Sequence, residues 1–423
     1  MVGRYKVYPE YNDSGVEWVG EIPTYWFVKP TFSVFDPTVT KNTEGQESTV
    51  LSLSYGNIIE RDVDTNFGLL PESFNTYQIV NDGDLILRLT DLQNDKKSLR
   101  VGLVKQTGII TSAYLKLKAN KSIEPRFAYR LLHSYDTTKV FYGMGGGLRQ
   151  SMKFEEFRRL PILIPPLEEQ HKIANFLDHE TAKIDTLIAK QEKLIELLQE
   201  KRQAVISHAV TKGLNPDVPM KDSDVEWLGE VPKHWRVVKL SYFLKLLSGD
   251  GITSDQIESE GEYPVMGGNG FRGYSSNYNC NGDYALIGRQ GALCGNINIA
   301  QGKFFASEHA VVVYPYINFN LTFLSEFLRF MNLGQYSISA AQPGISVERI
   351  NGLKIAIPPL DEQTHIGDKI EKMAYNFDGL IIKAETMIAV LKERKTALIA
   401  AAVTGKIDVR DWKPVENNLV EVA

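Results

Sequence analysis

The segment LPILIPPLEEQ at residues 160–170 occurs a second time, as LKIAIPPLDEQ at residues 353–363. In both copies an apolar, strand-like run meets two prolines, which suit the first turn of a helix because that turn leaves its N–H groups unpaired. The acidic residues that follow suit the positive end of a helix. The offset of 193 residues is far longer than the unit of a solenoid, so the pair predicts a duplicated domain.

A second repeated segment opens each half of the chain. Residues 13–26 are DSGVEWVGEIPTYW and residues 222–235 are DSDVEWLGEVPKHW, an offset of 209. Pro23 and Pro232 exclude a helix, so we interpret each segment as an extended clip whose tryptophans are packed. The two offsets differ by 16 residues, so the stretches between the matched ends differ in length. Matched ends around unmatched middles indicate a scaffold that holds two different globules.

The composition sets broad limits. A chain of 423 residues with 43% hydrophobic and 23% charged residues is expected to form two or more soluble domains. It has no apolar run long enough to span a membrane, and the N-terminus does not resemble a secretory signal. Two cysteines, Cys280 and Cys294, fit a reducing cytoplasm. The net charge of −5 argues against a uniformly basic nucleic-acid binder but leaves room for a local basic face.

The residues after each proline pair predict a helix of about 40–45 residues, roughly 65 Å long. Gly213 and Gly405 are placed to end these helices. Apolar side chains recur at steps of 3, 4 and 7, the spacing of a coiled-coil seam, and the two seams superpose at an offset of 193. The seam positions are Ile173, Leu177, Ile184, Leu187, Leu194, Leu198 and Val205, then Ile366, Ile370, Phe377, Leu380, Met387, Leu391 and Leu398. Each helix could pair with another protein, but identical seams in one chain favour an antiparallel pair.

The stretches before the proline motifs, residues 27–159 and 236–352, are termed the first and second globule. Both are strand-rich, and both contain Gly-Asp, an apolar run and an arginine, Arg88 or Arg289. We therefore expect an α+β fold: two similar mixed α/β, strand-rich globules separated by two long antiparallel coiled-coil helices, with a pseudo-twofold internal repeat. The expected parts are residues 1–159 (clip and globule), 160–213 (helix), 214–352 (clip and globule), 353–408 (helix) and 409–423 (tail).

A search for catalytic motifs finds none that is convincing. No P-loop is present, and the glycine-rich residues 143–147 precede no βαβ unit. Phe35-Asp36-Pro37-Thr38 lacks most of the tetrapeptide of amino-methyltransferases, and Glu393-Arg394-Lys395 lacks the partner motif of a nuclease. The histidines show no metal-ligand spacing. The sequence therefore predicts no catalytic residue, no metal site and no cofactor in this chain.

The remaining signal is a recognition surface. Lys plus Arg exceed Asp plus Glu by 3 in the first globule and fall short by 1 in the second, too little to hold DNA through phosphates alone. The loops are nevertheless rich in side chains that bond base edges or stack on nucleotides. In the first globule these DNA-binding candidates are Ser54, Tyr55, Asn57, Arg61, Arg88, Gln93, Asn94, Lys96, Lys97, Arg100, Arg149, Gln150 and Lys153. In the second they are Asn269, Arg272, Tyr274, Asn277, Tyr278, Asn279, Arg289, Gln290, His309, Gln342 and Ser346.

The order of clip, variable globule, I-P-P-L-[ED]-E-Q and a long helix ending near A-V-T occurs twice, the helix ends being Ala209–Thr211 and Ala402–Thr404. Over nearly the whole chain it resembles the specificity subunit of a type I restriction-modification system. The resemblance implies that each globule is a target recognition domain for one half of a bipartite double-stranded DNA site, and that the helices set the spacer. Globule sequence in this family varies with the DNA site, so no individual base contact is carried over.

The resemblance also implies partners and a location. The subunit would not be catalytic by itself. It would assemble in the cytoplasm with two modification subunits, which methylate adenine at N6 using S-adenosylmethionine. Restriction subunits, which use ATP and Mg, would translocate and cut the DNA. Two other classes stay open: a helical scaffold that does not recognise DNA, and an enzyme with an unrecognised site.

Overall fold

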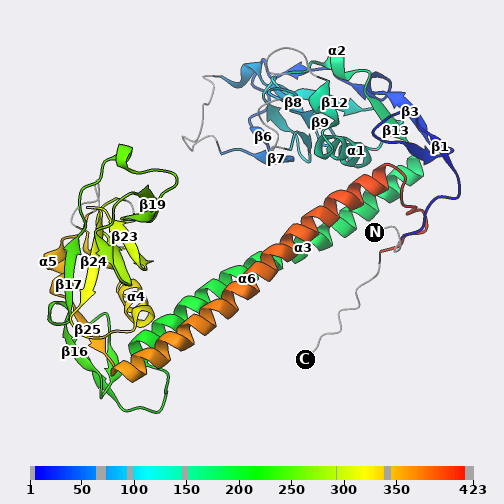
Figure 1. Cartoon of the computed structure of the whole chain (residues 1–423). Coiled ribbons are helices and arrows are strands. Elements are labelled where there is room, and N and C mark those ends of the chain that lie inside the picture. Colours follow the sequence, from blue (N-terminus) through cyan, green and yellow to red (C-terminus); the bar gives the residue numbers. More distant parts are fainter. Residues whose placement is uncertain are drawn as a thin grey trace. The chain divides into compact units, whose positions relative to one another are not determined.

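The computed structural model describes residues 5–62, 73–92, 99–144, 151–291, 293–337 and 344–414 (Figure 1). It forms two compact units. Unit 1 comprises Met1–Gln191 and Thr386–Ala423, and unit 2 comprises Glu192–Glu385. The division falls within both long helices, so each unit holds one clip, one globule and part of each helix. Seven DNA-binding candidates lie outside the described residues: Gln93, Asn94, Lys96, Lys97, Arg149, Gln150 and Gln342.

Each clip is a small two-stranded sheet, and the strand that follows it pairs with the strand of the proline motif. In unit 1 the antiparallel pairs are β1 (Tyr11–Asp13) with β2 (Glu21–Pro23) and β3 (Phe27–Pro30) with β13 (Pro161–Ile164). In unit 2 they are β14 (Met220–Asp222) with β15 (Glu230–Pro232) and β16 (Arg236–Lys239) with β25 (Lys354–Ile357). The two repeated sequence segments are thus joined in space, and the globule is the chain between them.

The first globule contains a four-stranded and a three-stranded sheet, a hairpin and a helix. The four-stranded sheet has the order β10 (Val101–Leu103), β9 (Leu85–Leu87), β12 (Leu115–Ala119), β4 (Phe35–Asp36). The three-stranded sheet has the order β11 (Gly108–Ile110), β8 (Gln78–Val80), β5 (Thr40–Lys41). The hairpin is β6 (Leu51–Ser54) and β7 (Asn57–Glu60), and the helices are α1 (Pro125–Thr137) and α2 (Phe154–Phe157).

The second globule contains two four-stranded sheets. The first has the order β17 (Leu244–Ser248), β24 (Ala310–Pro315), β21 (Tyr284–Gly288), β22 (Ile297–Ala300). The second has the order β19 (Gly270–Ser275), β18 (Tyr263–Gly267), β23 (Lys303–Ala306), β20 (Cys280–Asn281). Its helices are α4 (Leu321–Phe330) and α5 (Val347–Asn351).

The two globules share one sheet and differ in the other. Numbered in chain order, the strands of the shared sheet are arranged 3-2-4-1 in both globules, and all neighbours are antiparallel. The remaining sheets diverge, since β8 and β11 are antiparallel whereas β18 and β23 are parallel. This shared order supports the expectation of one skeleton with diverged loops.

The long helices begin directly after the proline pairs. α3 spans Leu167–Lys212 and α6 spans Leu360–Val403, 46 and 44 residues. Each is followed by a glycine with positive φ, Gly213 at 77° and Gly405 at 72°, as expected of a helix end. Within each unit the two helices lie side by side and run antiparallel (Figure 1).

The predicted seam is wrong at four positions. The side chains of Leu187, Leu194, Leu380 and Met387 are 43–49% exposed. The next residue in each case, Ile188, Ile195, Ile381 or Ile388, is the partly buried one. Both neighbours are apolar, so spacing alone does not distinguish them, and a straight helix drifts from a strict seven-residue repeat. The other ten seam positions are buried or partly buried.

Candidate nucleic-acid interface

The glutamate of each I-P-P-L-[ED]-E-Q motif holds the clip. Trp26 Nε1 and Tyr8 OH donate to Glu169 Oε1 at 3.1 and 2.5 Å. Burial and this carboxylate raise the pKa of the Tyr8 hydroxyl far above its usual range. In unit 2, Trp235 Nε1 donates to Glu362 Oε1 at 3.1 Å. Trp26 and Trp235 are buried, as expected of the clip, but Trp18 is 45% exposed.

The glutamine of each motif holds the helix of the globule. Gln170 Nε2 donates to the Pro165 carbonyl, and Gln170 Oε1 accepts from the backbone N–H of Glu124, the N-cap of α1. In unit 2, Gln363 makes the same bonds to Pro358 and to the backbone of Asn320, the N-cap of α4. The motif therefore ties clip, globule and long helix together. The repeat predicted its importance, but nothing in the sequence indicated these partners.

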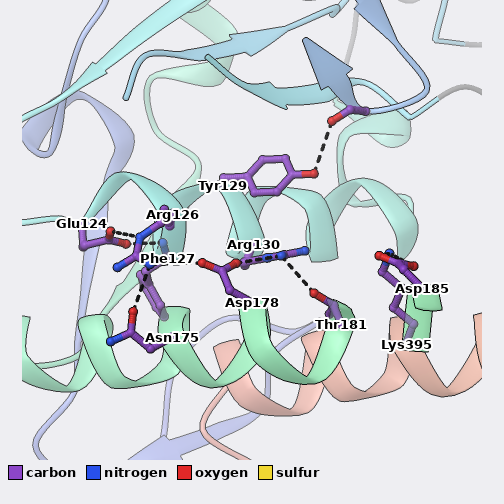
Figure 2. A network of polar contacts seen from close by, with 11 residues as sticks. Glu124, Arg126, Phe127, Tyr129, Arg130, Asn175, Asp178, Thr181, Asp185 and Lys395 are labelled. Carbon is purple, nitrogen blue, oxygen red and sulfur yellow. Dashed lines mark hydrogen bonds and ion pairs between the residues drawn. The ribbon is translucent and has the colours of Figure 1, made fainter. Parts of the chain in front are cut away.

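A charged network, not anticipated from the sequence, adds to this tie in unit 1 (Figure 2). Arg126 and Arg130 of α1 donate to the two oxygens of Asp178 on α3, at 3.1 and 2.9 Å. Arg126 also bonds Asn175, and Arg130 bonds Thr181. In unit 2 the residue at the repeat position equivalent to Asp178 is Glu371. It accepts one hydrogen bond, from the Thr322 hydroxyl of α4 at 2.5 Å. Among the described residues, the first globule thus makes more charge pairs with its long helix than the second.

Those candidates of the first globule that the structure describes lie mainly on the hairpin and at strand ends. Tyr55 and Asn57 are exposed at the hairpin turn beside the partly buried Ser54. Lys153 is exposed just before α2. Arg88, directly after β9, and Arg61, directly beyond the hairpin, are partly buried and make contacts within the protein.

Arg100 corrects the expectation of a DNA-facing arginine. Its side chain is fully buried. Its guanidinium donates to the carbonyls of Arg88, Thr90 and Asp91 and to the Tyr142 hydroxyl, while Asp136 accepts from its backbone N–H. Arg100 thus supports the chain that follows β9 from within. Five donors in a fixed fork suit this task as well as they suit a guanine.

The described candidates of the second globule are either exposed or partly buried. The exposed ones are Asn269, Arg272, Asn277, Tyr278 and Gln290; Tyr274, Asn279, Arg289, His309 and Ser346 are partly buried.

Several of the partly buried side chains make hydrogen bonds or ion pairs within the globule. Asn279 uses both ends of its amide internally, donating to Asp250 and to the Ala306 carbonyl and accepting from the Ala306 N–H, which indicates a structural role. Arg289 follows β21 and donates to the Ser248 hydroxyl at 3.2 Å. His309 Nε2 lies 3.2 Å from Glu308 Oε1.

The candidate Tyr278 belongs to an aromatic cluster whose other members, Tyr263 and Lys303, were not predicted from the sequence. The rings of Tyr263 and Tyr278 lie 4.9 Å apart, and Lys303 Nζ lies 4.8 Å from the Tyr278 ring. Lys303 is exposed on β23, where neighbouring residues alternate between the core and the surface. The sequence KFFA does not show this alternation, because Phe304 and Phe305 are both apolar, and it does not show the pairing of β23 with β18. The part of the chain that the structure describes has no helix long and apolar enough to cross a bilayer.

Comparison with known proteins identifies the class to which the chain belongs. The family model for the type I restriction modification DNA specificity domain matches residues 106–197 and 232–383, more than half of the chain. The chain therefore belongs to this family.

Individual relatives agree. The specificity subunit of the type I restriction enzyme EcoprrI from Escherichia coli is 39% identical over 137 residues, which cover 31% of this chain and 34% of that protein. The MjaVIII specificity subunit from Methanocaldococcus jannaschii is 24% identical over 79% of this chain and 81% of its own. This chain thus matches about a third of the first relative and most of the second.

Two solved structures share the fold. The first comes from work on the structural basis of complex assembly and conformational transition in the type I R-M system. It has a TM-score of 0.65 at 18% identity, and the match covers 90% of this chain and 98% of that chain. The HsdS subunit from Thermoanaerobacter tengcongensis has a TM-score of 0.53 at 17% identity, covering 91% and 98%. At these identities the likeness concerns the fold alone.

Proposed function

We propose that this protein is the DNA-recognition subunit of a type I restriction-modification complex and that each globule recognises one half of a bipartite site. The observation that carries the proposal is the combination of one shared sheet order, 3-2-4-1, with unlike loops. The shared part is fixed to the long helices by the same Glu-Gln motif in both units. A constant mount with variable contact loops is what two different half-sites of one DNA require.

The long helices act as a ruler in this proposal. They form an antiparallel coiled coil that relates the two globules by a pseudo-twofold axis and fixes the spacer between half-sites. The supporting facts are an ion pair between α3 and α6 in each unit and the Glu-Gln ties at the helix N-termini. Helix pairs of this length are stiff, so a distance set at one end is transmitted to the other.

The helices also offer surfaces for two modification subunits. In unit 1, Leu187, Met387 and Val390 are 46, 49 and 52% exposed. In unit 2, the residues at equivalent repeat positions are Leu380, Leu194 and Leu197, at 48, 43 and 49%. Exposed apolar side chains indicate a protein interface where they gather in one patch. Met387 and Val390, like Leu194 and Leu197, are three residues apart and therefore share one face of a helix. Two equivalent sets suit two copies of one partner.

Catalysis belongs to the partners in this proposal. The modification subunits supply methyl transfer from S-adenosylmethionine to adenine N6, and the restriction subunits supply the ATP- and Mg-dependent steps. The weak charge of the globules fits this division, since partner subunits then share the phosphate contacts. The complex acts on DNA in the cytoplasm.

Binding of the reconstituted complex to DNA tests the proposal. The site is identified by sequencing methyladenine in the host genome, and affinity is measured for this site and for duplexes altered in either half. Replacing residues 236–352 by the globule of a relative should change one half-site and leave the other intact, since base contacts are local to the loops that make them. A complex without sequence preference would favour a scaffold, and methyl transfer by the isolated chain would favour an enzyme.

A further inference from the structure

The tip of the β6–β7 hairpin carries a tyrosine in a conformation that tyrosine disfavours. Ser54 pairs with Asn57, so Tyr55 and Gly56 form a two-residue turn. Their φ angles, 45° and 80°, are those of a type I′ turn, for which Asn-Gly and Asp-Gly are the preferred sequences. A side chain with a Cβ such as tyrosine is strained in this left-handed region, whereas asparagine is tolerated there. The turn itself therefore does not explain Tyr55.

Packing does not explain it either. The side chain is 78% exposed, among the most exposed large side chains in the described part of the protein. Its hydroxyl and ring make no hydrogen bond or ring contact with any described residue. An exposed aromatic ring that the fold does not use, held at a strained position, suggests a contact outside the chain.

Contacts with neighbouring elements hold in place the hairpin that carries this ring. The Tyr129 hydroxyl of α1 donates to the Gly56 carbonyl at 3.3 Å (Figure 2). Leu53 and Ile58 cover Gly102 of β10 so closely that a Cβ on this glycine would lie 2.7 and 2.8 Å from them. Leu51 and Ile58 also pack with Val80 in a small core. The backbone of the turn is therefore anchored from two sides, which fixes the position of the Tyr55 Cα atom.

The surroundings of the ring suit a nucleic acid. Ser54 and Asn57 flank it with hydrogen-bonding groups that can reach base edges. Gly56 and Asn57 form one side of a cavity of about 420 Å³. Its lining includes Lys105 and three further cations, Arg126, Arg130 and Lys395, which pair with Asp178 and Asp185. Lys105 is exposed, so a cation lies close to the hairpin tip without crowding the ring.

We propose that Tyr55 stacks on a nucleobase of the DNA half-site recognised by the first globule. The inference rests on the proposed function and adds to it a particular contact, an aromatic ring against a base, at a particular place. The preformed turn lowers the ordering cost of binding, because only the side chain of Tyr55 has to be fixed. In a duplex both faces of a base are covered by its neighbours, so the ring inserts at a base step or meets a base turned out of the helix. Base–aromatic stacking of this kind tolerates any base. Tyr55 would then contribute affinity at this half-site, while the neighbouring polar side chains contribute the choice of sequence.

The test compares Tyr55→Asn with Tyr55→Phe in the full chain, assembled with its partner subunits. Asparagine restores the preferred Asn-Gly turn, so the melting temperature of the isolated chain should rise by roughly 2 °C. Affinity for the cognate duplex should nevertheless fall by roughly 5- to 100-fold, the range of one lost base stack. Tyr55→Phe keeps the ring and should stay within about twofold of wild type. Tyr242→Asn is the control for loss of a surface ring, since Tyr242 of the second globule is 70% exposed; this change should leave recognition of the first half-site unchanged.

Photocrosslinking locates the contact. Pyrimidines of the first half-site are replaced one at a time by 5-iodouracil, and a crosslink to residue 55 is expected for wild type and Tyr55→Phe but not for Tyr55→Asn. If wild type binds its site selectively, either equal affinity of Tyr55→Asn or the absence of a crosslink at residue 55 of wild type overturns the inference while the proposed function stands. If wild type shows no sequence-selective binding, the proposed function itself fails.

Discussion

Lys395 of α6 donates to both carboxylate oxygens of Asp185 of α3, at 2.6 and 2.7 Å. The repeat makes the same contact in unit 2, where Arg202 of α3 occupies the position of Lys395 and lies 3.6 Å from Asp378 of α6. The acid and the base have exchanged helices between the two contacts. An apolar seam alone lets an antiparallel pair slide, whereas charges at defined levels specify one register.

The first prediction concerns this register. Asp185→Lys should lower the melting temperature, and adding Lys395→Asp should restore most of the loss because the reversed pair can form. The side chains are 54 and 30% exposed, so the coupling energy should be only about 0.5 kcal/mol. Thermal unfolding of the four members of the cycle at low and high salt measures it. A coupling that salt leaves unchanged would speak against an ion pair.

A second prediction follows from His133 on α1. Burial, together with the charges of Arg130 and Lys395, lowers the pKa of His133 to about 4. The unfolded chain takes up this proton at the ordinary pKa of about 6.5, so it binds more protons than the folded chain between these values. His133 should therefore stabilise the fold fully above pH 6.5 and lose this contribution as the pH falls toward 4, by up to about 3 kcal/mol.

The melting temperature measured from pH 8 to pH 4 tests this window. His133→Phe, which cannot take up a proton, should flatten the curve between pH 6.5 and 4. His171→Gln, a change at an exposed histidine of α3, is the control and should leave the shape unaltered. A wild-type curve already flat in this window would contradict the assignment.

Local sequence patterns were sufficient to predict the two long helices. Proline pairs, acidic first turns and glycine ends are local signals, and they predicted α3 and α6 to within a few residues. The seam at Leu187 was wrong because Ile188 beside it is equally apolar. The prediction that Arg100 faces DNA was wrong because its hydrogen-bond partners, among them Tyr142, come from elsewhere in the chain. Local chemistry thus predicted the elements, while long-range contacts decided which side chains face outward.

A third prediction concerns the docking of partners. Replacing Leu187, Met387 and Val390 by glutamate should remove one modification subunit from the complex, because charged side chains cannot be buried in an apolar interface. The equivalent change at Leu380, Leu194 and Leu197 should remove the other. The masses of the reconstituted complexes report the stoichiometry. Unfolding temperatures close to wild type would show that the helices remain intact, and two bound subunits in both variants would place the docking surface elsewhere.

A fourth prediction concerns Arg289. Arg289→Ala should weaken binding of the complex to its cognate duplex by about 1–3 kcal/mol if the guanidinium contacts a base. The loss should then depend on the base pair at one position of one half-site. A phosphate contact would instead lower the affinity evenly across sequences and reduce the salt dependence. Lys233→Ala, an exposed cation of the second clip, is the control. Equal affinities and salt slopes would remove Arg289 from the interface.

The last prediction tests whether the length of the helix pair sets the spacer between half-sites. The two ion pairs between α3 and α6 determine which insertions are compatible with the fold. Four residues inserted after Leu194 add about 6 Å and about one turn to α3, close to two base pairs of duplex. This point lies between Asp185 and Arg202, so a longer α3 alone cannot keep both charge pairs in register with α6. The matching point in α6 is Met387, which lies between Asp378 and Lys395.

Insertions of four residues at both points should therefore preserve both pairs and melt near wild type, whereas either insertion alone should melt lower. Methyladenine sequencing of DNA from cells that carry the double insertion should show both half-sites unchanged and a spacer longer by one or two base pairs. The added turn nearly preserves the facing of the apolar side chains, although it interrupts the seven-residue repeat. An unaltered spacer in a complex that still methylates DNA would mean that something other than the helix pair sets the distance between half-sites.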